Sequence, residues 1–323
     1  MVLGTVELGL DYGINNKKGR PTLYQAYELL ETAWECGIRE LDTASAYGES
    51  ERVIGKYQID TGHFFSVDTK IRGSLNCDEL ETSLFSSCEK LKTDRLNVLY
   101  LHSFEQCKEK RVIDFLTNVK AQGYASQIGI SIYEPREMEF ILTNLPEIDV
   151  IQLPFNIFDN YRWQSDNLLK RAVSAGKTLY ARSIFLQGLF FMDSSDSFVS
   201  SIGASQFIED LGELSIESNM SISQLAFKYV QTVPEIFSII VGCQDEEEVR
   251  KNIELEKKDI EIDLEIKNRL EDIAERVPPL VIDPRKWKRS IRNEDISNYS
   301  SQDEFCEAAG KSINESCGET YAT

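Results

Sequence analysis

Four side chains that could together deliver a proton to a carbonyl group follow three successive strand-like runs. Asp42 ends the first run and precedes Tyr47 by five residues, Lys70 ends the second, and His102 ends the third. A tyrosine with an ordinary pKa near 10 is a weak acid at neutral pH, and a neighbouring ammonium would lower that pKa. Asp42 could anchor Lys70 through a salt bridge, and His102 could orient the carbonyl oxygen. This set predicts proton donation to oxygen while hydride arrives at carbon.

Short β-type runs alternate with longer amphipathic stretches along most of the chain. The predicted strands are Val2–Leu8, Glu40–Asp42, Phe64–Lys70, Val98–His102, Gln127–Ser131, Val150–Leu153, Thr178–Ser183 and Phe237–Val241. The predicted helices include Leu23–Cys36, Asp78–Lys90, Val112–Gln122, Pro135–Thr143, Asn167–Ala175, Ser223–Thr232 and Glu246–Leu255. Gly37, Gly123 and Gly176 follow three of these helices, where a left-handed residue commonly ends the last turn.

This alternation predicts a parallel sheet with right-handed crossovers. An open doubly wound sheet would usually carry a glycine-rich phosphate turn after its first strand, but Leu10–Gly13 contains no such motif. Eight strands favour a closed (β/α)₈ TIM barrel formed as a single domain by residues 1–287. Residues 288–323 are rich in Ser, Asn, Asp and Glu, which predicts a polar and mobile tail outside the barrel.

Three of the four residues also have a purely structural interpretation. Asp42 and Lys70 could form an ion pair that seals the top of the barrel, and His102 could be a hydrogen-bonded core histidine. The strand ends of a barrel share one face, however, and active sites of this fold lie there. Four matching residue types at three neighbouring strand ends therefore favour catalysis over structure.

Composition and charge limit the kinds of partner. The net charge of −19 and the pI near 4.7 disfavour binding to nucleic acid or to an anionic membrane surface. No run approaches the ~18 apolar residues of a membrane span, and the start of the chain does not resemble a signal peptide. The 7 cysteines are scattered, without a C-x-x-C pair, and only 2 histidines are present, which argues against a zinc site. The expected protein is cytoplasmic, with reduced thiols.

The stretch from Leu41 to Glu51, Leu-Asp-Thr-Ala-Ser-Ala-Tyr-Gly-Glu-Ser-Glu, resembles the signature of the aldo-keto reductases. Lys70 in Asp-Thr-Lys-Ile and His102 in Tyr-Leu-His-Ser match the other two active-site positions of that family. The similarity covers essentially residues 1–287. It implies a (β/α)₈ barrel, an extended NAD(P)H across the top of the barrel without a Rossmann domain, and direct hydride transfer to aldehydes or ketones.

Further positions of the family imply a set of contacts to NADP(H) or NAD(H). The implied contacts are Gly4, Thr5, Asp42, Ser131, Gln152, Arg182, Ser183, Leu186, Gly188, Gly242, Gln244, Glu248 and Asn252. Ser131 and Gln152 match the groups that hold the nicotinamide carboxamide. The residues after the seventh strand resemble the loop that covers the pyrophosphate. Those after the eighth match the segment that grips the adenosine phosphate, with Asn252 at the adenine-contacting position.

Three of these positions depart from the commoner family pattern. Ile132 replaces an asparagine beside Ser131, and Arg182 replaces an aromatic residue that stacks on the nicotinamide. A planar guanidinium can also stack, although Arg182 could instead form a buried ion pair. Glu248 stands where NADPH-preferring members carry an arginine, which favours the use of NADH, because a carboxylate accepts hydrogen bonds from ribose hydroxyls. It could also simply favour the helix dipole, and Arg250 or Lys251 could still reach a phosphate.

Aromatic residues after the strands predict a pocket rim suited to small or medium organic carbonyls or sugars. The rim candidates are Tyr12, Phe104, Tyr133, Phe155 and Phe158, which could equally pack the top of the barrel. The expected substrate contacts are Tyr47, His102 and Phe104. The main hypothesis is an NAD(P)H-dependent aldehyde or ketone reductase. The alternatives are the same site run as a sugar or alcohol dehydrogenase, and a nucleotide-sensing barrel subunit with little turnover. The sequence leaves protein partners open.

Overall fold

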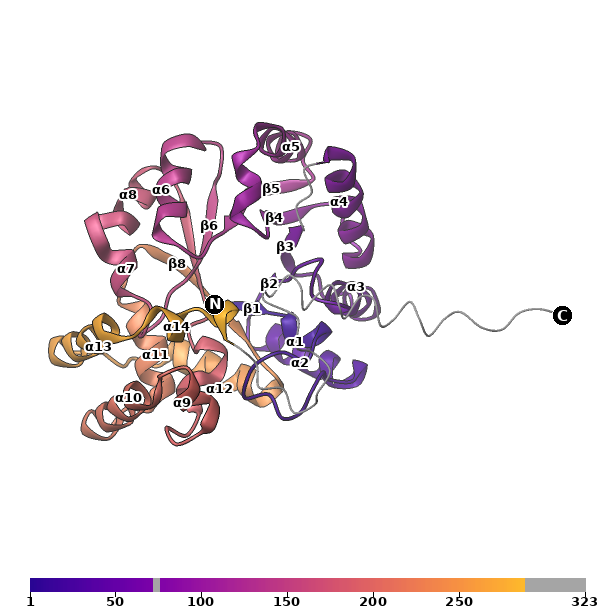
Figure 1. Cartoon of the computed structure of the whole chain (residues 1–323). Helices are drawn as coiled ribbons and strands as arrows, with labels where there is room; N and C mark the ends of the chain where they lie inside the picture. The colour runs from indigo at the N-terminus through magenta and orange to yellow at the C-terminus, as the bar shows by residue number, and fades with distance from the viewer. Residues whose placement is uncertain (72–75, 288–323) are drawn as a thin grey trace.

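Eight parallel strands close into a barrel at the centre of the molecule (Figure 1). The computed structural model describes residues 1–71 and 76–287. The strands are β1 (Val2–Gly4), β2 (Glu40–Asp42), β3 (Ser66–Ile71), β4 (Leu96–Leu101), β5 (Ala125–Ser131), β6 (Val150–Pro154), β7 (Thr178–Arg182) and β8 (Ile236–Gly242). Each strand pairs with its neighbour in the chain, and β8 pairs with β1. The predicted (β/α)₈ barrel is confirmed.

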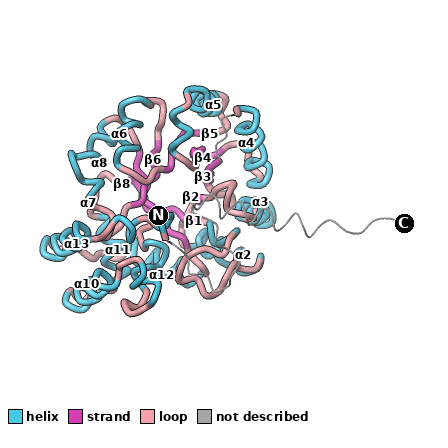
Figure 2. Tube along the Cα trace, in the orientation of Figure 1, coloured by secondary structure: helices cyan, strands magenta, loops and turns pink. Residues whose placement is uncertain are grey.

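Helices surround the strands on all sides, as the cyan ring around the magenta strands in Figure 2 shows. The longer helices are α2 (Leu23–Glu35), α3 (Ser50–Thr61), α4 (Cys77–Leu91), α5 (Lys110–Ala121), α6 (Pro135–Asn144), α8 (Leu168–Ser174), α10 (Ser205–Glu217), α11 (Ile222–Gln231), α12 (Glu246–Lys257) and α13 (Leu264–Arg276). Short turns of helix are α1 (Val6–Gly9), α7 (Tyr161–Gln164), α9 (Ser197–Ser201), α14 (Pro279–Ile282), η1 (Phe104–Lys108), η2 (Ser165–Asn167), η3 (Leu186–Phe191) and η4 (Pro284–Lys286).

The amphipathic pattern of α2 shows why these helices pack against the barrel. Leu29 and Leu30 are fully buried, while the opposite face of the helix is polar. The helix begins at a capping box in which the Thr22 side chain and the Gln25 side chain each bind the other's backbone amide. At its other end, Gly37 adopts a φ of +94°, as predicted for a glycine that ends a helix.

The interior of the barrel is filled by side chains from β1, β4, β6, β7 and β8. They form a separate apolar cluster of Val2, Val98, Tyr100, Val150, Tyr180 and Ile240. The fully buried ring of Tyr100 fits only because Gly129 on the next strand has no side chain. A Cβ at Gly129 would lie 2.6 Å from two carbons of that ring. This packed layer makes a floor beneath the strand ends, which is where the predicted chemistry lies.

Most predicted elements are found within a few residues of their predicted bounds, but the first strand is a correction. The predicted strand Val2–Leu8 is divided into β1 and the helical turn α1. The chain turns because both the amide and the hydroxyl of Thr5 donate to the carbonyl oxygen of Asp42, at 3.0 and 2.9 Å. Residues 288–323, predicted to be a polar tail, lie outside the described residues. In the part of the chain that is described, no helix is long and apolar enough to cross a membrane.

Candidate active site

Asp42 and Lys70 form a buried ion pair at the carboxyl ends of β2 and β3. The Lys70 ammonium lies 2.6 Å from Asp42 Oδ2, with side-chain exposures of 1% and 6% for the lysine and the aspartate. Lys70 Nζ also donates to the carbonyl oxygen of Thr43 at 3.1 Å, and Gln152 Nε2 donates to Asp42 Oδ1 at 2.7 Å. Each charge is therefore compensated, which a buried pair requires. The anchoring of Lys70 by Asp42, expected from the sequence, is present.

Tyr47 lies on the loop between β2 and α3, and two glycines fix that loop against α1. A Cβ at Gly9 would collide with the carbonyl oxygen of Tyr47, and a Cβ at Gly48 would collide with that of Gly9. Gly48 has a φ of +52°, a region that favours glycine. The Ser50 hydroxyl ties the start of α3 to Thr5, at 2.8 Å from its carbonyl oxygen. The backbone packing therefore fixes the position of the Tyr47 backbone, from which the side chain extends.

The Tyr47 ring faces both Lys70 and His102. The Lys70 ammonium lies 5.2 Å from the centre of the tyrosine ring, and the His102 ring meets it edge to face with centroids 5.9 Å apart. The four side chains thus meet at one end of the barrel, as the order of the strands predicts.

The pKa of Tyr47 differs from the expectation that Lys70 would lower it. Burial of the hydroxyl, followed by the negative charge of Asp42, raises the pKa of Tyr47 well above 10, and Arg182 is the cation that opposes this rise. Burial also lowers the pKa of Lys70, despite its partner Asp42. The prediction considered only the charges and omitted the cost of removing a phenolate from water. Tyr47 is consequently protonated at neutral pH, the state that a proton donor needs.

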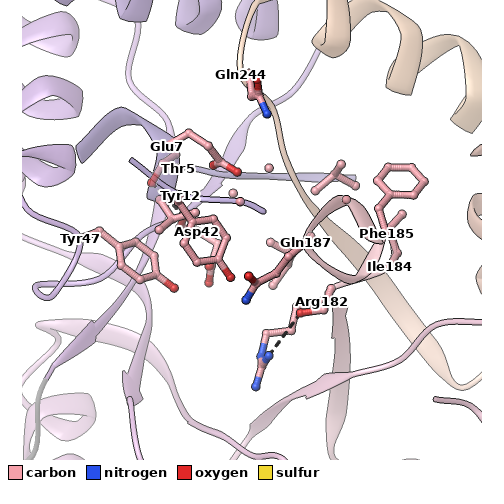
Figure 3. Close-up of a pocket in the computed structure, with 18 of the residues that line it drawn as sticks. Thr5, Glu7, Tyr12, Asp42, Tyr47, Arg182, Ile184, Phe185, Gln187 and Gln244 are labelled. Atoms are coloured by element: carbon pink, nitrogen blue, oxygen red, sulfur yellow. Dashed lines mark hydrogen bonds between the residues drawn. The ribbon is translucent and has the colours of Figure 1, made fainter. Parts of the chain in front are cut away.

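A cavity of about 230 Å³ extends from these residues across the top of the barrel. Figure 3 shows Tyr47, Tyr12 and Asp42 on one side of it, Arg182 and Gln187 on another, and Gln244 further along. The loop after β7 forms one wall, and four of its residues have positive φ: Ser183, Leu186, Gln187 and Gly188. Three of these are not glycine, and such costly backbone conformations gather at ligand-binding loops.

The comparisons with known proteins agree with this geometry. Residues 1–274 match the model of the aldo/keto reductase family. The chain belongs to this family. It is therefore an NAD(P)-dependent oxidoreductase, as the resemblance implied.

Individual relatives are distant. An aryl-alcohol dehydrogenase of Pestalotiopsis microspora, GME11368, is 26% identical over 273 residues, which cover 73% of this chain and 69% of the relative. The methylglyoxal reductase DkgB of Escherichia coli O157:H7 is 33% identical over 117 residues, 34% of this chain and 43% of the relative. Among solved structures, the holo form of aldo-keto reductase AKR11C1 from Bacillus halodurans superposes with a TM-score of 0.70 at 17% identity, covering 85% of this chain and 91% of that one.

Most of the cofactor contacts that the family implied do line the cavity of this aldo-keto reductase. They are Gly4, Thr5, Asp42, Ser131, Gln152, Arg182, Ser183, Gly188, Gly242, Gln244 and Glu248. Leu186 and Asn252 do not line it. Leu186 is 1% exposed because it turns into the core, and the buried amide of Asn252 lies 3.4 Å from Cys243 Sγ.

The aromatic rim needs correction at three positions. Phe104 packs edge to face on Phe140 with ring centres 5.5 Å apart, and it is not among the residues that line the cavity. The η1 turn after β4 directs this ring into the wall of the barrel. Phe155 and Phe158 are also buried in the core. Tyr12 and Tyr133 do line the cavity.

Several further residues of the cavity were not predicted from the sequence. These are Val6, Glu7, Gly13, Asn15, Ile184, Phe185, Gln187, Phe191, Ile240 and Val241. Glu7 was hidden because it fell inside a predicted strand. Gln187 lies between the loop residues Leu186 and Gly188 that the family pattern indicated, and Phe191 follows them. Including the whole loop in the prediction would have found both.

Two features of the cavity fit a nicotinamide dinucleotide. Gln152 Oε1 is buried and accepts no hydrogen bond from the described residues, so it can accept one from the nicotinamide carboxamide. Gly4 and Gly242 lie side by side where β1 pairs with β8, and a Cβ at Gly4 would come 3.3 Å from the Gly242 nitrogen. Gly4 therefore lines the cavity with its backbone alone, whereas the position of a Cβ at Gly242 is filled by the Glu7 carboxyl. Elsewhere in residues 1–71 and 76–287, no three His, Cys, Asp or Glu side chains group as metal ligands would.

Arg182 makes contacts with neutral groups at the end of β7. Its guanidinium donates to the Ile132 carbonyl oxygen at 3.1 Å and to Ser183 Oγ at 3.4 Å. It also lies over the Tyr133 ring, 4.2 Å from the ring centre, and Arg285 lies 3.7 Å from the same centre. The alternative of a buried ion pair with a carboxylate finds no support in these contacts. Arg182 also lines the cavity.

The start of α12 is acidic on its cavity side. Glu248 Oε2 accepts from the Gln244 amide at 2.8 Å, and burial raises the pKa of Glu248 above its usual value. Lys18 pairs with Asp245, the residue that caps α12, and the two nearby cations on the helix itself point elsewhere. Arg250 lies 3.7 Å from Glu35 on α2, and Lys251 pairs with Glu247 at 2.7 Å. Neither arginine nor lysine of this helix is therefore placed to replace the missing phosphate-binding cation.

Proposed function

We propose that this aldo-keto reductase reduces an aldehyde or ketone by direct hydride transfer, with Tyr47 as the general acid. The observation that carries the proposal is the convergence of Tyr47, His102 and the Asp42–Lys70 ion pair at one end of the cavity. A bound NADH or NADPH would supply the hydride. Everything else in the reaction, namely orienting the carbonyl and delivering a proton to its oxygen, falls to these four side chains.

The Tyr47 hydroxyl donates its proton to the carbonyl oxygen as negative charge develops there. His102 lies beside the tyrosine ring, where it can orient the same oxygen and share the proton. The buried Lys70 ammonium stabilises the phenolate that results, because the electrostatic attraction acts in a region of low dielectric. Asp42 keeps Lys70 in place. The raised pKa of Tyr47 in the free protein keeps the hydroxyl protonated but makes it a weaker acid, so proton donation depends on the stabilisation of the phenolate by Lys70.

The dinucleotide is proposed to lie along the cavity, with its nicotinamide end at Ser131 and Gln152 and its adenosine end at Gln244 and Glu248. The acidic start of α12 supports the use of NADH, because a carboxylate repels a 2′-phosphate but accepts hydrogen bonds from ribose hydroxyls. The cofactor is thus proposed to be NAD(H), with NADP(H) bound more weakly.

The substrate is proposed to be a small or medium carbonyl compound that rests against Tyr12, Tyr133 and Phe191. These aromatic side chains border the cavity near Tyr47 and offer apolar surface around a few polar groups. The reverse reaction, oxidation of a sugar or alcohol, uses the same residues. One relative is named for a dehydrogenase and another for a reductase, so both directions belong in the test.

The function is tested by titrating the protein fluorescence with NADH and NADPH and then measuring turnover with a panel of carbonyls, sugars and alcohols. We expect tight NADH binding and carbonyl reduction. Tyr47→Phe should lower kcat by about 10² or more while leaving the Kd for NADH unchanged. If Tyr47→Phe kept more than about a tenth of the rate, Tyr47 would not be the acid. Strong nucleotide binding without multiple turnover on any substrate would favour a nucleotide-sensing barrel instead.

A further inference from the structure

Glu7 is an acidic side chain in the wall of the cavity with no role in the proposed chemistry. It lies on the α1 turn, and Figure 3 shows it above Thr5, on the side of the cavity toward Gln244. Its carboxyl group rests directly against the backbone of Gly242, so closely that a Cβ at Gly242 would collide with it. In that view the carboxyl lies between Asp42 and Gln244, and Glu248 lines the same cavity.

The Glu7 carboxyl has no cation beside it. Its Oε2 atom is buried and receives no hydrogen bond from the part of the chain that the structure describes. The titratable groups that interact with it are Glu248 on α12 and Cys243, which directly follows β8. Lys18 is held by Asp245, and Lys70 at the far end of the cavity is held by Asp42.

A carboxylate in these surroundings is costly, because it loses water without gaining a partner. The neutral acid is therefore favoured. Burial, with a smaller contribution from the charge of Glu248, raises the pKa of Glu7 to about 8, and its own backbone amide is the only group that acts in the opposite direction. A neutral carboxyl group differs from a carboxylate in one respect that matters here, since it has an O–H to donate.

We propose that Glu7 is a nucleotide-binding residue that donates a hydrogen bond, as a neutral carboxylic acid, to a phosphate oxygen of the dinucleotide. This inference rests on the proposed function, because it requires a dinucleotide in the cavity. The diphosphate is the assigned group because it lies between the nicotinamide and the adenosine of an extended cofactor, and Glu7 lies between the residues proposed for those two ends. The ionised form of Glu7 would instead repel the diphosphate.

The consequence is a nucleotide affinity that depends on the protonation of one residue. Below about pH 8 Glu7 carries its proton and binds the diphosphate; above it, the carboxylate must first take up a proton. The Kd for NADH should then rise about tenfold between pH 7 and pH 9. NADH is the suitable probe because it lacks the 2′-phosphate, whose own titration would complicate the curve.

The experiment is a fluorescence titration with NADH at a series of pH values between about 6.5 and 9.5, using the full-length protein. Glu7→Gln keeps a donor of nearly the same shape but cannot ionise, so its Kd should stay flat across this range. Glu247→Gln is the matched control, because it removes one negative charge from the exposed side of α12. The control should retain the tenfold rise of the wild type, and so show that the loss of one negative charge does not by itself make the Kd independent of pH.

Two outcomes separate the inference from the proposed function. Equal pH dependence in wild type and Glu7→Gln would overturn the role of Glu7 while leaving the reductase intact. Absence of NADH binding at every pH, in every variant, would overturn both. If Glu7→Gln does not fold, calorimetry of the wild type in two buffers of different ionisation enthalpy decides the matter. Uptake of part of a proton per NADH near pH 8.5 is expected, and no uptake would contradict the proposal.

Discussion

At the scale of single residues, the site depends on how a few charges are compensated inside the barrel. Asp42 receives hydrogen bonds from Lys70 and Gln152, and Lys70 adds one to a backbone oxygen. These contacts turn a costly burial of two ions into a rigid support for Tyr47. Glu7, by contrast, has no such support, and burial raises its pKa to about 8.

Removing one partner of the buried pair should be far more damaging than removing both. Lys70→Met leaves Asp42 buried without its cation and should lower the free energy of unfolding by about 3–5 kcal/mol. The double variant Asp42→Asn with Lys70→Met leaves no unpaired charge and should recover much of that loss. Urea unfolding of the two variants measures the difference. Additive losses in the double variant would mean that the two side chains contribute independently to stability.

Glu248 is the residue that should decide between the two nicotinamide cofactors. Glu248→Arg replaces a carboxylate, proposed to lie near the adenosine ribose, with a cation that can bind a 2′-phosphate. The ratio of Kd for NADPH to Kd for NADH should fall at least tenfold, as fluorescence titration with both nucleotides would reveal. Arg250→Glu, on the part of α12 that faces α2, should leave the ratio alone. An unchanged ratio in Glu248→Arg would place the adenosine elsewhere.

At the scale of elements, close backbone contacts determine where the side chains of the site can be. Gly9 and Gly48 let the turn α1 touch the loop that carries Tyr47, and Gly129 lets β5 pass the ring of Tyr100. The strand ends therefore lie directly above the packed layer of side chains inside the barrel, which includes Tyr100. A change in that layer should therefore displace the strand ends and the side chains of the site that they carry.

Gly129→Ala tests this packing. The new methyl group would meet the Tyr100 ring at 2.6 Å and the Val150 carbonyl oxygen at 2.9 Å, so ring and strand must move apart. Such overpacking should lower the free energy of unfolding by about 1–3 kcal/mol in urea. Gly212→Ala in α10 is the matched control, because nothing lies within 4 Å of the added carbon. The control should raise stability by up to about 1 kcal/mol, and equal effects would refute the packing argument.

At the scale of the whole molecule, the last described segment, residues 278–287, packs against the barrel beside the cavity. Trp287 is 7% exposed and packs on Phe198 with ring centres 5.4 Å apart, and Val281 is fully buried. Arg285 reaches Tyr133, which lines the cavity. We therefore propose that the folding unit ends at residue 287, beyond the residue 274 at which the family match ends.

Two truncations test that boundary. A chain cut after residue 287 should keep the melting temperature within a few degrees of the full-length protein. A chain cut after residue 277 loses two buried apolar side chains and should melt about 5 °C lower or more. Scanning calorimetry compares them. Equal melting temperatures would show that the segment 278–287 adds nothing to the fold.

The sequence by itself determined the barrel and the three residues expected around Tyr47, namely Asp42, Lys70 and His102. Both follow from local signals, since eight alternating runs imply closure and the end of a strand is recognisable from the chain alone. Only the tertiary structure decided the properties that depend on burial. It placed Glu7 in the cavity wall and Phe104 in the barrel wall, and it raised the pKa of Tyr47 instead of lowering it. These outcomes depend on tertiary contacts, because segments distant in the sequence determine how far a side chain is buried and which charges lie near it. A local sequence pattern does not contain that information.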